Sequence, residues 1–194
     1  MKKYINYYFI IFFLFISLKV NSDTALKNKA INYLGSLKNF SSSFIQNDGE
    51  NLSEGSVYIG EKRVRAEYLY PTKILIILDQ NKAMYYNYDL EEDEFFNPKD
   101  TSAWFFYDIF RNPNFFKDSR MTLDENSIIL EKKGIDSEET DYLIKVFFEN
   151  NPLILRKIEV NVNEEYLQIS IFNHNYNRDF KANFFKLINP SLLN

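Results

Sequence analysis

Short segments of alternating apolar and polar residues fill most of the chain from residue 42 onward. The predicted strands are Ser42–Asn47, Gly55–Ile59, Arg63–Tyr70, Lys73–Leu78, Ala83–Tyr88, Asp93–Phe96, Ser127–Lys132, Tyr142–Phe148, Ile154–Val162, Tyr166–Phe172 and Phe180–Leu187. Hairpin-length turns containing Asn, Asp or Gly separate most of these segments. The pattern predicts one large antiparallel sheet, curled into a barrel or half-barrel.

Helical periodicity replaces this alternation in two places. Residues 23–38 carry Leu26, Ala30, Leu34 and Leu37 on one apolar stripe, which predicts an amphipathic helix. The second place, residues 101–111, interrupts the series of strands.

The predicted helix over residues 101–111 is unusually apolar. Thr101 or Ser102 can cap its start, and Pro113 prevents its continuation. Six of its eleven residues are aromatic or Ile, more than a single core-facing stripe requires. Two interpretations follow: the helix is a lid over an apolar cavity, or it is a plug buried in the core.

Alternation within Arg63–Tyr70 assigns the two faces of the sheet. Val64, Ala66 and Tyr68 point to one face, which we expect to be inside, and the charged residues between them point to the other. The next segment, Ile74–Leu78, is apolar on both sides. It is therefore covered on both faces, or lines a cavity with one of them, and we expect its concave face to lie under the helices.

The first 22 residues are predicted to be a secretory signal peptide. Lys2 and Lys3 precede the short apolar run Phe9–Leu18, and small residues end the segment near Ser22. A membrane span needs about 20 apolar residues, more than this run contains. Cleavage after Ser22 would leave one domain, residues 23–194, in the periplasm.

Charge and cysteine content narrow the possible functions. Loss of Lys2, Lys3 and Lys19 with the signal peptide would change the net charge from −4 to −7. An acidic chain without a basic tract is a poor partner for nucleic acid and for anionic lipid headgroups. Since the sequence has no cysteine, it has neither disulfides nor the acylated cysteine of a bacterial lipoprotein.

Residue patterns for catalysis are scarce. His174 is the only histidine and is expected in a polar loop, and no Gly-x-Ser-x-Gly motif accompanies it. The five glycines occur singly, so the sequence has no glycine-rich loop that could bind phosphate. The acidic run Glu91–Glu94 lacks the spacing of a calcium-binding loop. We therefore expect no enzyme, no metal and no other cofactor. The 19 Phe and 14 Tyr residues favour apolar binding.

Several motifs together resemble the LolA family of outer-membrane lipoprotein carriers. Phe40–Gln46 is similar to the family's F-x-x-x-F-x-Q strand, and Val64–Pro71 is similar to its F-R-x-E-Y-x-x-P segment. Ile77–Asp89 resembles the family's I-V-x-D-G-K stretch with the aromatic strand and Y-D that follow it. The helix from Thr101 and the closing segment, residues 175–190, occupy the corresponding positions. The resemblance covers roughly residues 24–190 and depends on the order and spacing of these motifs.

This resemblance implies a mainly β (α+β) fold, an open antiparallel half-barrel with helices covering its concave face. It implies a monomeric periplasmic chaperone that receives lipoprotein acyl chains from an inner-membrane ABC transporter of the Lol system. A LolB-like outer-membrane receptor would then accept them. The expected acyl-chain pocket is Val57, Ile59, Val64, Ala66, Tyr68, Ile76 and Leu78, and the expected lid residues are Trp104, Phe105, Phe106, Ile109 and Phe110.

The sequence departs from the family at the arginine that is implicated in closing the lid. The family has Arg-Pro at this place, whereas this chain has Gly60–Arg63 without proline. Lys62, Arg63 and Arg65 are the candidate latch residues.

Two alternative functions remain. One is a LolA-like domain that binds or senses another lipid. The other is a small outer-membrane β-barrel, which the charged face of Arg63–Tyr70 opposes.

Overall fold

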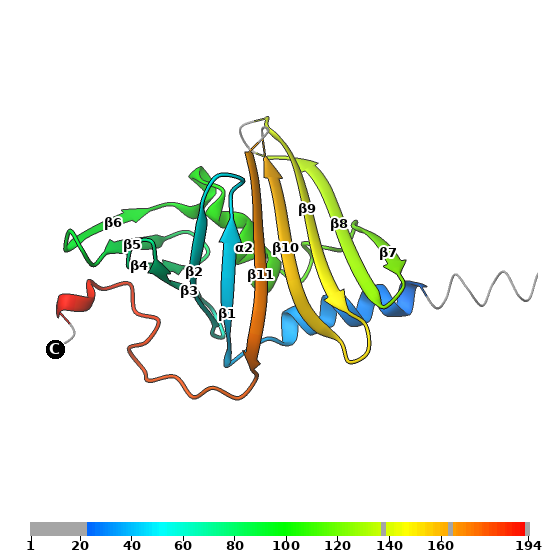
Figure 1. Cartoon of the computed structure of the whole chain (residues 1–194), viewed down its shortest axis with the longest axis horizontal. Helices are drawn as coiled ribbons and strands as arrows, with labels where there is room; N and C mark the ends of the chain where they lie inside the picture. Colours follow the sequence, from blue (N-terminus) through cyan, green and yellow to red (C-terminus); the bar gives the residue numbers. More distant parts are fainter. Residues whose placement is uncertain (1–22, 137–138, 163–164, 193–194) are drawn as a thin grey trace, which may run out of the picture.

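A computed structural model describes residues 23–136, 139–162 and 165–192, so the expected signal peptide lies outside the described residues. Within them, eleven strands form one antiparallel sheet in the order β6-β5-β4-β3-β2-β1-β11-β10-β9-β8-β7. The strands are β1 (Phe40–Asn47), β2 (Leu52–Ile59), β3 (Val64–Tyr70), β4 (Ile74–Leu78), β5 (Ala83–Asn87), β6 (Glu92–Phe96), β7 (Arg120–Asp124), β8 (Ser127–Ile135), β9 (Asp141–Glu149), β10 (Ile154–Val162) and β11 (Glu165–Asn175). Strands β6 and β7 are the edges of this open sheet (Figure 1).

Both predicted helices are confirmed. Residues 23–36 form the N-terminal helix, and α2 (Ala103–Arg111) follows the short 3-10 helix η1 (Pro98–Asp100). A second 3-10 helix, η2 (Pro190–Leu192), lies near the end of the chain. None of the helices in the described part of the chain is both long and apolar enough to cross a membrane.

The expected open half-barrel with helices on its concave face is also confirmed. Ten predicted strands overlap observed ones, but Phe180–Leu187 is wrong as a strand because this segment forms turns. It lies against a face of the sheet, where its aromatic rings are partly buried but its backbone has no strand edge to pair with. The pattern does not predict β7, an edge strand with few apolar residues.

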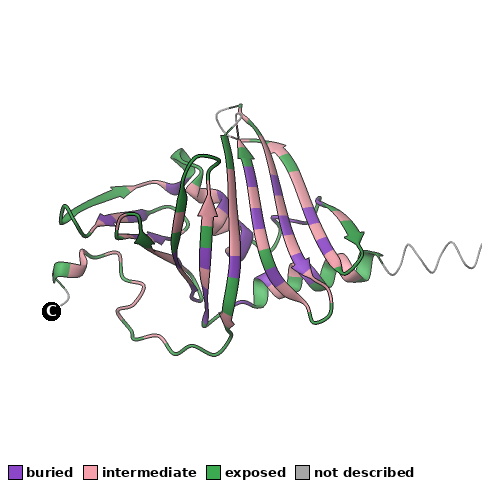
Figure 2. Cartoon of the chain, viewed as in Figure 1, coloured by how far each residue is buried: buried purple, intermediate pink, exposed green. Residues whose placement is uncertain are grey.

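The main hydrophobic core lies between the concave face of the sheet and the two helices. The N-terminal helix supplies Ala30 and Leu34 of the predicted stripe, Leu37 follows directly after the helix, and all three are buried. Along β9 the buried residues alternate with partly exposed ones (Figure 2), because successive side chains of a strand point to opposite faces. The N-terminal helix ends before Asn39, whose positive φ of 54° lets the chain turn into β1.

The convex face has a smaller core of its own. Its buried members are Leu75, Ile77, Met84 and Tyr86, and Leu187 packs against them. Leu187 belongs to the C-terminal segment (residues 176–192), which follows β11 and passes across β2 to β5 (Figure 1). Strand β4 is therefore covered on both faces, as its doubly apolar sequence predicts.

Candidate ligand-binding cavity

A hollow of about 340 Å³ lies between the concave face of the sheet and α2. Its walls come from β1 to β4, β6, β10 and β11, and from the start and inner side of α2. The lining residues are Phe44, Gln46, Val57, Val64, Ala66, Tyr68, Ile76, Leu78, Phe96, Thr101, Ser102, Ala103, Phe106, Phe110, Ile158, Leu167, Ile169 and Ile171. None of these side chains, all in the described part of the chain, is charged.

The residues predicted for the pocket lie together here. Val57, Val64, Ala66, Tyr68, Ile76 and Leu78 line the hollow. The seventh predicted residue, Ile59, is fully buried and belongs to the main core. Sequence reasoning missed the contribution of β10 and β11, whose inward side chains close the far wall. Alternation marks their apolar face, but only the curvature of the sheet brings that face to the hollow.

Small residues on the concave face leave room for the hollow. Strand pairing places Ala66 between Val57 of β2 and Ile76 of β4, so a single methyl group occupies the centre of this row. Gly55 has another role, because a Cβ there would lie 2.2 Å from a backbone oxygen of β3 and 2.7 Å from the ring of Phe44. The missing side chain lets the Phe44 ring lie against β2 and form a wall.

One pair of polar side chains interrupts this apolar lining. The hydroxyl of Tyr68 donates a 2.8 Å hydrogen bond to Oε1 of Gln46. The Tyr68 ring also packs edge-on against Phe44, with the ring centroids 5.1 Å apart. Burial raises the pKa of Tyr68 to about 12, so its hydroxyl keeps its proton and acts as a donor at neutral pH.

Helix α2 has a different environment on each of its sides. Ala103, Phe106 and Phe110 border the hollow, whereas Phe105 and Ile109 are buried in the main core. A substitution at Phe105 would therefore disturb the core before it disturbed the cavity, whereas Phe106 lines the hollow and is only partly buried.

The outer side of α2 faces a second and more polar hollow of about 560 Å³, lined in part by Trp104, Tyr107 and Asp108. Trp104 also packs against Tyr142 of β9, with ring centroids 5.6 Å apart. The helix thus combines the two sequence interpretations: it is anchored in the core on one side and covers a cavity on another.

Arg111 fastens the C-terminal end of α2, and sequence reasoning did not select it. Its Nη2 donates to the carbonyl oxygen of Leu37, just after the N-terminal helix, and its Nη1 donates to the carbonyl oxygen of Glu61 at 3.4 Å. Burial lowers the pKa of Arg111. In the sequence, the only sign of this role was that Arg111 is a basic residue in the last turn of a predicted helix, where such side chains can bond to free carbonyl oxygens. At the other end, Thr101 accepts a bond from the helix backbone and Ser102 makes no side-chain cap.

Two of the three latch candidates, Arg63 and Arg65, contact the C-terminal segment rather than α2. Arg63 donates to the Phe185 carbonyl oxygen at 2.8 Å, and Arg65 donates to that of Phe184 and lies 4.2 Å above its ring centroid. Lys62 is exposed in the turn before β3. The reason is the alternation itself: since even-numbered residues of β3 face the hollow, the odd-numbered arginines face the convex side.

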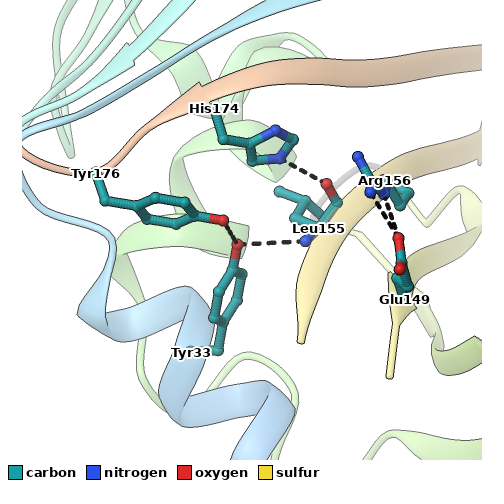
Figure 3. A network of polar contacts seen from close by, with 6 residues as sticks. All are labelled: Tyr33, Glu149, Leu155, Arg156, His174 and Tyr176. Atoms are coloured by element: carbon teal, nitrogen blue, oxygen red, sulfur yellow. Dashed lines mark hydrogen bonds and ion pairs between the residues drawn. The ribbon is translucent and has the colours of Figure 1, made fainter. Parts of the chain in front are cut away.

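Figure 3 shows how the N-terminal helix is attached to the sheet. The hydroxyl of Tyr33 lies 2.8 Å from that of Tyr176 and accepts a 3.3 Å bond from the backbone nitrogen of Leu155. His174 Nε2 donates to the Leu155 carbonyl oxygen at 2.7 Å. Leu155 pairs with Phe148 of β9, but the pairing of β10 with β11 begins only at Lys157. Side chains therefore bond to the Leu155 backbone groups in place of the β11 backbone.

The contacts of His174 are with aromatic rings and with the backbone of a neighbouring strand. The residue lies in β11, so the predicted loop position is wrong, and its ring stacks on Tyr176 and meets Phe40 edge-on. Burial lowers its pKa.

The acidic run Glu91–Glu94 is exposed at the sheet edge. Across the described residues, no group of three or more His, Asp or Glu side chains is arranged to hold a metal ion.

Comparison with known proteins gives a fold and not a family. No protein-family model and no curated protein matches the sequence. Among solved structures, an uncharacterized conserved protein from Thermus thermophilus aligns over 84% of this chain and 94% of its own, with a TM-score of 0.52 and 9% identity. That likeness shows a shared fold over nearly the whole of both chains.

Two structures of MucB with MucA are more distant. A chain of the Pseudomonas aeruginosa MucA/MucB complex aligns over 82% of this chain, with a TM-score of 0.48 and 9% identity. A complex of MucB with MucA(peri) aligns over 81%, with a TM-score of 0.45 and 7% identity. The alignments cover 60% and 57% of those chains, so this chain spans less than two thirds of their length.

Proposed function

We propose that this protein is a periplasmic carrier that binds lipoprotein acyl chains between its curved sheet and α2. In this proposal it is a binding protein and not an enzyme. It would take its cargo from an inner-membrane ABC transporter and release it to a LolB-like outer-membrane receptor. The observation that supports the proposal best is the uncharged, largely apolar hollow under α2. The family motifs in the sequence support the cargo and the route.

Hydrocarbon has a strong reason to enter such a hollow. A methylene group is about as large as a water molecule, which takes about 30 Å³ in the liquid, so 340 Å³ holds about eleven such groups. At about 0.8 kcal/mol per buried methylene, their transfer from water gives about 9 kcal/mol. Release then needs no chemical step if a receptor offers an equal or larger apolar surface.

A lipoprotein with up to three long acyl chains needs more space than this hollow has. We therefore propose that α2 moves outward when cargo binds, since the helix separates the apolar hollow from the polar one on its other side. The Arg111 bonds hold the C-terminal end of the helix, whereas Ser102 makes no side-chain cap at the other end. The end near Ser102 would therefore move first, and this movement would have to release Phe105 from the core. Cargo shifts this equilibrium only as far as it binds the open state more tightly.

The size of the hollow favours a second candidate function. One hydrocarbon chain of about eleven carbons fits without any movement of α2. A LolA-like domain that binds or senses a single-chain lipid would use the hollow as it stands. The two candidates differ in the ligand that the protein retains when it is purified from cells.

The hollow can be filled by one substitution in the middle of its floor. Ala66→Phe adds a ring between Val57 and Ile76, and we expect binding of an apolar dye and of a lipopeptide to fall at least about tenfold, because the space for hydrocarbon is lost. Ala182→Phe, at an exposed position of the C-terminal segment, is the matched control. Unchanged binding by a folded Ala66→Phe protein would exclude the hollow as the lipid site.

Native mass spectrometry of protein isolated from cells identifies the cargo. A retained triacylated lipoprotein supports the carrier, whereas a single-chain lipid supports the second candidate. Passage of a lipopeptide to a purified LolB-like receptor then tests the release step.

A further inference from the structure

The polar pair in the cavity wall has unused hydrogen-bonding capacity. Tyr68 donates to Oε1 of Gln46, which leaves the Gln46 amide nitrogen with two N–H donors pointing away from that bond. No acceptor for these donors is found among the described residues. Gln46 is only partly buried and lines the hollow, so a bound molecule can reach its amide.

The lining also determines which charge a ligand can carry. Since no lining residue is charged, a carboxylate drawn into the hollow would lose its hydration without gaining a cation. A neutral carbonyl oxygen loses far less and can accept a bond from the Gln46 amide. Nearby Thr101 and Ser102 line the wall formed by the start of α2, and the rest is apolar.

We infer that Gln46 recognises the carbonyl oxygen of a neutral acyl ester or amide, with Tyr68 holding the amide in place, and that free fatty-acid anions are rejected. The hydrocarbon chain then extends along Val57, Ala66 and Ile76 towards Phe106. This inference rests on the proposed function, because it assumes that the hollow binds an acyl chain. It adds the linkage chemistry that the site selects, which both lipoproteins and phospholipids share.

The test measures displacement of the uncharged dye N-phenyl-1-naphthylamine from the purified protein at about pH 8, where a fatty acid is ionised. Methyl undecanoate, undecanoate and undecane match the volume of the hollow and differ only in the end group. We expect the ester to bind at least about tenfold more tightly than the anion. Gln46→Leu should weaken ester binding about fivefold relative to undecane binding, because only the ester uses the amide donor.

The sheet offers a matched control on its other face. Tyr166 donates a 3.1 Å hydrogen bond to Oε1 of Gln168, the same pair of groups as Tyr68 and Gln46. Because Leu167 and Ile169 line the hollow, Gln168 between them points to the convex side. Gln168→Leu should therefore leave every ligand affinity unchanged. Tyr68→Phe should reduce ester binding by less than Gln46→Leu does, because the donor stays but is no longer held.

A carbonyl readout separates recognition from a general effect on folding. Methyl undecanoate labelled with ¹³C at its carbonyl should show a lowered stretching frequency when bound to the wild-type protein, and this shift should be absent in Gln46→Leu. A diacylglyceryl lipopeptide and a short-chain phosphatidylcholine, compared in the same assay, distinguish the two sources of an acyl ester.

Each outcome decides a different question. Equal binding of ester and anion, or a Gln46→Leu protein that binds the ester like wild type, overturns the inference and leaves the proposed function standing. If neither the dye nor any chain binds the wild-type protein, the proposed function itself fails. Tight ester binding that Gln46→Leu weakens, with an unchanged Gln168→Leu control, supports the inference.

Discussion

The two faces of the sheet are covered in different ways. On the concave face, α2 is packed into the core through Phe105 and fastened at its end by Arg111, and a hollow lies beneath its inner side. On the convex face, the C-terminal segment has no regular structure before η2, and its aromatic rings pack directly on the strands. Arg63 and Arg65 hold its carbonyl oxygens.

A single strand can therefore serve two purposes, one on each of its faces. In β4, Ile76 borders the hollow while its neighbour Ile77 is fully buried under the C-terminal segment. The apolar hollow lies where α2 spans the sheet, since a rigid helix cannot follow every indentation of the surface below it. An irregular segment can follow the surface, and its side chains fill the gaps.

Alanine substitutions of these two neighbours should lower the free energy of unfolding by different amounts. Ile77→Ala should lower the free energy of unfolding by about 3 kcal/mol, because it leaves a cavity in a packed cluster. Ile76→Ala should cost about 1–2 kcal/mol, because the Ile76 side chain already borders empty space. Urea unfolding of the two variants measures both values, and equal losses would show that the two faces are packed alike.

A smaller effect is expected from loosening the convex cover. Arg65→Met removes the bonds to Glu67 and to the Phe184 carbonyl oxygen and should cost about 2 kcal/mol. Hydrogen exchange should speed up in residues 180–187, with dye binding in the hollow unchanged. Arg156→Met is the control: its exposed pair with Glu149 joins β10 to β9, away from residues 180–187, and contributes less than about 1 kcal/mol. A change in dye binding would mean that the covers are coupled.

The smallest effect concerns pH and the attachment of the N-terminal helix. Burial lowers the pKa of His174 in the folded protein, so the unfolded chain takes up the proton first as the pH falls. The contribution of His174 to stability is complete above its unfolded pKa of about 6.5 and declines below it. His174→Gln keeps a donor for the Leu155 carbonyl oxygen but does not titrate.

Denaturant midpoints at about pH 7.5 and about pH 5 measure this contribution. The wild-type protein should lose more stability between the two pH values than the His174→Gln variant, in which the carboxylates titrate as before. Identical losses would show that burial does not lower the His174 pKa.

Local patterns predicted much of the site. Alternation in β3 placed Val64, Ala66 and Tyr68 on one face, and the structure brings that face to the hollow. The same alternation turns Arg65, and Arg63 just before the strand, away from α2, although the resemblance to the LolA family made both latch candidates. Position along the chain was a poorer guide than the period of the strand, because a strand fixes the face of each side chain directly.

Elements whose stability comes from distant partners were harder to predict. Segment 180–187 has the composition of a strand, yet β1 already pairs with β2 and β11, so no edge is free where the segment lies. Strand β7 has few apolar residues of its own and forms by antiparallel pairing with the neighbouring strand β8. Arg111 became recognisable only when the chain brought the Leu37 carbonyl oxygen within reach, 74 residues away.

The amino-acid sequence alone sets the period of each element, the apolar side of each strand and the uncharged residues of β3 and β4 that line the hollow. These are local properties, because they depend on the geometry of neighbouring residues along one strand or helix. Three further features appear only in the folded chain: part of the inner face is left unfilled, α2 covers the gap, and Arg63 and Arg65 hold the segment on the convex face. Those outcomes depend on how strands far apart in the chain pair and curve, and on the distance at which a rigid helix comes to lie above them.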